Sequence, residues 1–185
     1  MILCQKLRPA LFACAVLWLV GCKAVIHFNS TATQATPPAG KFSKILFVEE
    51  MGDMVAYKFY NNVRRDLRRE LAARKIQCEF VRTTPTMADP GGRIADAMGR
   101  FQPDAVVRLT DCEVDDYVWL DIGWGPFHDD AHEITVEMSL RPAGSDSVLW
   151  TADLFVDQFF GVDVASEKVA RRMVEKLAAD GMIRD

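Results

Sequence analysis

The chain has 185 residues, 50% of them hydrophobic, and its 26 acidic side chains exceed its 22 basic ones to give a formal charge of −4. That length is enough for one domain with a real hydrophobic core. The acid excess argues against a nucleic-acid partner, because phosphate contacts need a positively charged protein surface.

The first 21 residues have the pattern of an export signal. Lys6 and Arg8 lie in a start without acids, and an uninterrupted apolar run follows from Ala10 to Gly21. The run is shorter than the about 20 residues that a membrane-spanning helix needs. A charged start, a short apolar segment and a small residue at its end predict a signal peptide over 1–21.

The end of this run resembles the lipobox of bacterial lipoproteins, with Leu19, Val20, Gly21 and Cys22 in matching positions. The resemblance implies cleavage before Cys22, a diacylglycerol on its thiol and an acyl chain on its new amine. Lys23 stands where an aspartate would favour the inner membrane, so the resemblance implies the periplasmic face of the outer membrane. The outer face of the inner membrane is the alternative for the location. An ordinary secretory signal with a chance cysteine is the alternative for the anchor.

Residues 22–42 are predicted to be a lipidated cysteine followed by a flexible tether. No apolar periodicity is evident there, and Ser, Thr, Ala and Pro dominate after Phe28. Such a tether of 20 residues would reach about 25 Å. Loss of 1–21 removes two basic residues, so the mature chain would carry a charge of −6.

Residues 43–185 are expected to form one periplasmic domain. Apolar spacing and turn residues, with Asp89-Pro90 as a helix start, predict the elements in chain order. These are a strand at 44–49, a helix at 54–75, a strand at 76–82, a helix from Asp89-Pro90 to 102–104, strands at 105–109, 134–140 and 148–156, and a helix from 163 or 166 to 179. The order β-α-β-α-β-β-β-α predicts an α/β (α+β) fold with a mixed five-stranded sheet and helices packed mainly on one face.

This order resembles a group of small periplasmic lipoprotein domains: the curli-secretion lipoprotein, the penicillin-binding-protein activator and the TolB N-terminal domain. The matching segments lie at 101–107, 148–152 and 174–183, and the resemblance spans roughly 44–183. It implies a non-catalytic adaptor or assembly factor of the cell envelope. It also implies an envelope protein as partner, and it leaves the oligomeric state open.

Two cysteines remain in the predicted domain, Cys78 and Cys112, and each falls in a predicted strand. An even pair in an oxidising compartment makes a disulfide possible. The bridge requires neighbouring strands, because the two Cα atoms must lie about 4.4–6.8 Å apart. Two buried free thiols are the alternative.

The segment from 111 to 133 is the densest group of polar residues. His128, Asp130 and His132 alternate, so on a strand they would share one face and offer a weak zinc or manganese site. A calcium site is an alternative, because the segment is rich in carboxylates, but acidic loops are usually just solvated. The acids are Asp111, Glu113, Asp115, Asp116, Asp121, Asp129, Asp130 and Glu133. We find no phosphate-binding loop, nucleophile elbow or Cys-x-x-Cys pair.

Aromatic side chains are interleaved with those acids. Trp119, Trp124 and Phe127 lie in or near a glycine turn at 123–126, and such residues dominate binding hot spots. They are predicted to contact a partner, with a lid folded over the sheet as the alternative. Arg64 and Arg68 are predicted on the helix face opposite the apolar stripe, where they would meet phosphates or an acidic partner, or only solvent.

The sequence therefore predicts a membrane-anchored adaptor with no catalytic residues and no cofactor beyond the lipid on Cys22. The competing hypothesis is a metal-binding protein or metal-dependent hydrolase that uses His128, Asp130 and His132.

Overall fold

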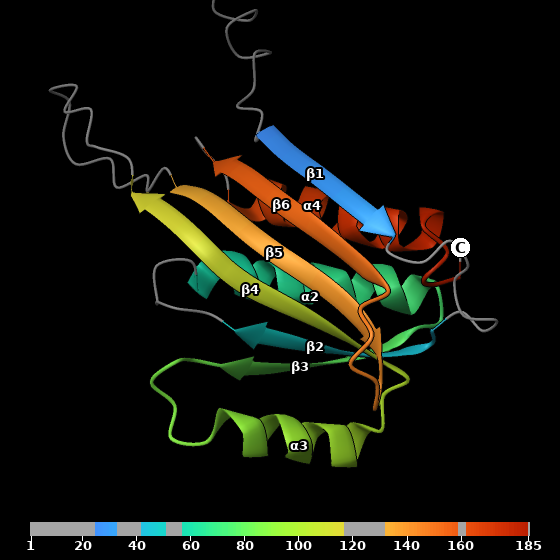
Figure 1. The fold of residues 1–185 in the computed structure, drawn as a ribbon. Coiled ribbons are helices and arrows are strands. Elements are labelled where there is room, and N and C mark those ends of the chain that lie inside the picture. The colour runs from blue at the N-terminus through green and yellow to red at the C-terminus, as the bar shows by residue number, and fades with distance from the viewer. Residues whose placement is uncertain (1–24, 33–41, 51–56, 117–131, 159–161, 185) are drawn as a thin grey trace, which may run out of the picture.

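The computed structural model describes residues 25–32, 42–50, 57–116, 132–158 and 162–184, which form a six-stranded sheet and three helices (Figure 1). In chain order these are β1 Val25–Ala32, β2 Lys44–Glu50, α2 Tyr57–Ala73, β3 Gln77–Thr83, α3 Pro90–Phe101, β4 Ala105–Asp116, β5 His132–Pro142, β6 Trp150–Gln158 and α4 Val162–Ala179. The expected α/β order is confirmed from β2 onward.

The sheet is mixed, as predicted, with strand order β1-β6-β5-β4-β2-β3. β2 pairs in parallel with β3 and β4, which follow α2 and α3 in the chain. β4, β5 and β6 then form an antiparallel meander, with a register shift between Asp111 and Glu113. All five central residues of β2 are buried, whereas most residues of the edge strand β3 are only partly buried.

The prediction of five strands is wrong, because the expected tether at 22–42 contains β1. This strand pairs antiparallel with β6 over its whole length, from Val25 opposite Asp157 to Ala32 opposite Trp150. Ile26 is buried and Phe28 packs on the core, whereas His27 and Asn29 are exposed. This alternation is the sequence signal of a half-covered strand, and it is only four residues long.

Two helices cover one face of the sheet and one covers the other. α2 and α4 enclose the main core, which includes Phe47, Leu67 and Trp150. In Figure 1, α3 lies apart from α2 and α4, and it covers a second cluster that includes Leu46 and Val81. The expectation that helices pack mainly on one face thus holds for two of the three described helices.

The start of α3 follows the predicted signal, and a glycine ends α4. Asp89 accepts a hydrogen bond from the backbone N–H of Gly92 at 2.7 Å, and Pro90 occupies the first turn of α3. Gly181 has a φ of 78° after α4, a left-handed conformation in which glycine is favoured.

None of the helices in the described part of the chain combines the length and apolar character that a membrane crossing requires.

Candidate functional site

Most of the predicted site residues lie outside the described residues. These are Cys22, Trp119, Trp124, Phe127, His128 and Asp130. His132 is the first residue of β5 and stands opposite Asp116, the last residue of β4. The segment 117–131 therefore joins the ends of two paired strands. Within the described ranges, no three His, Cys, Asp or Glu side chains are grouped to hold a metal ion.

The structure contradicts the predicted disulfide between Cys78 and Cys112. β2 lies between their strands, and Cys78 stands opposite Ile45, level with Ala105. Cys112 is seven residues beyond Ala105, or about 23 Å along the strand, which exceeds the reach of a disulfide. The Cys78 thiol is free, and its burial raises its pKa to about 11, with Arg68 nearby opposing the shift.

The arginines of α2 contact their own chain. The Arg64 guanidinium donates to both carboxylate oxygens of Glu49, with the Nε to Oε1 distance at 3.2 Å. Arg68 remains exposed, and its guanidinium carbon lies 4.9 Å from the centre of the Phe80 ring. The long Arg64 side chain thus reaches from the helix to the sheet, and the predicted partner role of Arg64 and Arg68 stays a prediction.

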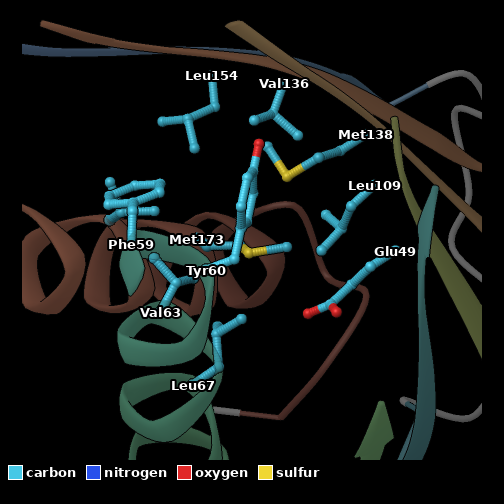
Figure 2. Close-up of a pocket in the computed structure, with 11 residues that line it drawn as sticks. Glu49, Phe59, Tyr60, Val63, Leu67, Leu109, Val136, Met138, Leu154 and Met173 are labelled. Atoms are coloured by element: carbon cyan, nitrogen blue, oxygen red, sulfur yellow. The ribbon is translucent and has the colours of Figure 1, made fainter. Parts of the chain in front are cut away.

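Glu49 borders a small cavity under α2 and α4. Its side chain is only 2% exposed, and Arg82 adds a second cation whose Nε lies 3.6 Å from the Glu49 carboxylate. Figure 2 shows the mostly apolar side chains around the cavity, among them Leu109 and Met138. The cavity measures about 20 Å³, which is far smaller than a site for a small-molecule ligand. Glu49 is therefore a structural carboxylate.

A second buried carboxylate, Asp66, joins α2 to α4. Asp66 is fully buried, accepts a hydrogen bond from the Ser166 hydroxyl at 3.1 Å, and pairs with Arg65 and Arg69 at 3.2 Å. The sequence does not reveal this contact, because Asp66 and Ser166 lie 100 residues apart and belong to different helices. Its role is to hold the two helices together.

β1 is tied to the domain by what we call the Asp180 network, formed by Asp180, Trp150, Ser30 and Lys176. The Asp180 carboxylate accepts hydrogen bonds from Trp150 Nε1 at 2.8 Å, Ser30 Oγ at 2.8 Å and Lys176 Nζ at 3.3 Å. At the other end of the strand, Arg172 donates to the Ile26 carbonyl oxygen at 2.8 Å. Both ends of β1 are thus fastened to α4 and the loop after it.

One part of the sheet has no helix over it among the described elements, and we call it the open sheet face. α3 packs on β2 and β3, on the face opposite α2 and α4. The same face of β1, β6 and β5 carries exposed polar side chains, including Asn29, Asp153 and Glu137. His27 and Phe155 are also neighbours there, with ring centres 6.1 Å apart.

Comparisons with known proteins identify a fold but no family. No family model and no curated protein matches the chain. Among solved structures, it is similar to a PelC dodecamer from Paraburkholderia phytofirmans, with 12% identity, a TM-score of 0.52, and coverage of 87% of this chain and 100% of that one. A variant of that dodecamer from the same organism is 13% identical, with a TM-score of 0.52, and the match covers 86% of this chain and 100% of that one. A minor lipoprotein from Acinetobacter baumannii is 8% identical, and the match covers 75% of this chain and 94% of that one. Its TM-score of 0.31 is too low to show a shared fold. The likeness to the PelC dodecamer shows a shared fold.

Proposed function

We propose that this chain is a lipid-anchored envelope protein that acts as a non-catalytic adaptor, held at the periplasmic face of the outer membrane. The observation that supports it most is the position of β1. The strand begins at Val25, three residues after Cys22, and is an integral edge of the sheet. Three residues span at most about 11 Å, so lipidation of Cys22 would hold the domain directly against the headgroups.

The binding surface in this proposal combines the open sheet face with the segment 117–131. That segment carries Trp119, Trp124 and Phe127 and joins β4 to β5, which both continue past the last paired residue of β2. Aromatic anchors with a polar surround are typical of protein interfaces. One structure with this fold is a dodecamer, so a second copy of the chain is one partner that an experiment must distinguish.

The anchor is tested by replacing Cys22 with serine. We expect the wild-type protein to incorporate labelled palmitate and to yield an acylated Cys22 peptide in mass spectrometry. The variant should lose both signals and migrate as an uncleaved precursor, because serine has no thiol to carry the diacylglycerol. Cys78→Ser is the matched control and should label like wild type, since its thiol is partly buried in the domain. Unchanged palmitate incorporation in Cys22→Ser would exclude the anchor.

The adaptor role is tested by Trp124→Ala with crosslinking in intact cells. We expect several-fold less crosslinked product and an unchanged thermal unfolding midpoint, since in this proposal Trp124 contacts the partner. The mass of the product separates a different envelope protein from a second copy. Val148→Ala is the control, because Val148 is an exposed apolar residue far along the chain from the segment. Equal crosslinking by wild type and Trp124→Ala would contradict this surface.

A further inference from the structure

A basic groove lies between α4 and the start of β1. It has a volume of about 250 Å³ and is lined by Ile26, Lys168, Arg171, Arg172 and Glu175. Three cations face one carboxylate there, although the chain as a whole is acidic. The groove therefore has the opposite charge to the protein that carries it.

The cations of this basic groove differ in how they are held. Arg172 is fixed by its hydrogen bond to the Ile26 carbonyl, and a guanidinium keeps further N–H donors beyond that one. Arg171 pairs with Glu167 at 2.8 Å, but Glu167 also contacts Arg69 at 3.8 Å. Lys168 is exposed and has no ion-pair partner among the described residues. The groove thus combines one fixed donor with two exposed cations at its rim.

The position of the groove indicates what fills it. Ile26 is four residues after Cys22, so at most about 14 Å of chain separates the groove from the predicted acyl anchor. Basic side chains this close to a bilayer are attracted to anionic lipid, and the attraction fades within a Debye length of about 10 Å. In Figure 1, β1 and α4 lie together at the same edge of the sheet. The cations are therefore at the corner of the domain that an anchored chain brings to the membrane.

We propose that the basic groove binds the phosphate of an anionic phospholipid and so sets the orientation of the domain on the membrane. This inference rests on the proposed lipid anchor for its biological setting. Its chemistry is independent of the acyl chains: guanidinium and ammonium groups pair with a phosphodiester. The anchor supplies attachment, and the groove determines which side of the domain faces the bilayer.

The test uses the chain from residue 22 onward with Cys22→Ser, which retains every described residue and carries no acyl chain. Its partition onto phosphatidylcholine vesicles is compared with that onto vesicles that also contain phosphatidylglycerol. We expect binding only to the second kind, weakened by salt. The pair Lys168→Glu and Arg171→Glu should lower the partition coefficient by well over thirtyfold, because loss of the two cations alone accounts for about that factor. The milder pair Lys168→Gln and Arg171→Gln should lower it in the same direction, and circular dichroism checks the fold of each variant.

The matched control reverses two exposed charges on α3, Arg93→Glu and Arg100→Glu, and should bind like the parent chain. An equal loss in the control would overturn the proposal, because net charge would then explain the binding. Equal partition onto both vesicle types would also overturn it. Displacement by inorganic phosphate at matched ionic strength would assign the groove to free phosphate and overturn the lipid assignment. Each of these failures leaves the palmitate result on Cys22 unaffected, so the two proposals are separable.

Discussion

Replacing Arg64 with alanine is expected to lower the free energy of unfolding by about 3 kcal/mol. The substitution removes both hydrogen bonds to Glu49, a carboxylate that is only 2% exposed. A buried charge without its partner is costly, because the protein interior solvates it poorly. Arg82 still lies 3.6 Å from Glu49, so the loss falls at the lower end of the range for such pairs. Urea unfolding measures it directly.

A matched variant separates the buried pair from the mere loss of an arginine. Arg93→Ala removes an exposed guanidinium from α3 and should change the unfolding free energy by less than about 0.5 kcal/mol. Adding Glu49→Gln to Arg64→Ala should recover part of the stability, because the amide is neutral. If Arg64→Ala and Arg93→Ala lower the free energy of unfolding equally, the ion pair between Arg64 and Glu49 does not stabilise the fold.

Replacing Asp180 with alanine is expected to lower the free energy of unfolding by about 2–3 kcal/mol and to loosen β1 in particular. The change leaves the indole N–H of Trp150, a fully buried residue, and the Ser30 hydroxyl without their acceptor. Hydrogen exchange should show a loss of protection at the amides of Val25–Ala32 that exceeds the loss in β4. Asp153→Ala is the control, because this exposed carboxylate of β6 lies on the open sheet face.

The same network makes β1 sensitive to acid. Desolvation by burial would raise the pKa of Asp180, but hydrogen bonds from Trp150, Ser30 and Lys176 together hold that pKa below its usual value. The folded state thus favours the carboxylate, whose stabilisation is present above the unfolded pKa of about 4 and is lost as pH falls through the folded pKa. Protection of the β1 amides should decrease over this range in wild type. Asp180→Asn should remove that pH dependence. If wild type and Asp180→Asn show the same dependence of β1 amide protection on pH, Asp180 is not the group that makes β1 sensitive to acid.

Local signals in the sequence predicted most elements, because each depends on neighbouring residues. The apolar run at 44–49, the Asp89-Pro90 helix start and the alternation at 134–140 all correspond to observed elements. β1 was missed because its apolar alternation is limited to Ile26 and Phe28, and its stability depends on β6, more than a hundred residues away. A strand of that kind is fixed by tertiary contacts rather than by its own pattern.

For the site residues too, features set by neighbouring residues were predictable, and contacts between distant residues were not. The apolar stripe of α2 was predictable, but the reach of Arg64 to Glu49 was not, because it depends on how the helix lies on the sheet. The disulfide prediction failed because the chain places β2 between the strands of Cys78 and Cys112. Strand order is a global property, and no spacing of two cysteines reveals it.

The pairing of β1 with β6 also sets an order of events during folding. Ala32 and Trp150 are the closest partners in sequence along that ladder, and they are separated by 118 residues. Closing so long a loop is entropically unfavourable and slow compared with forming the local contacts of β2 to β4. We therefore expect the first strand to join the sheet last. In the proposed lipoprotein, cleavage and acylation at Cys22 would then precede completion of the sheet, and the pairing of β1 with β6 would bring the anchored end of the chain to the finished domain.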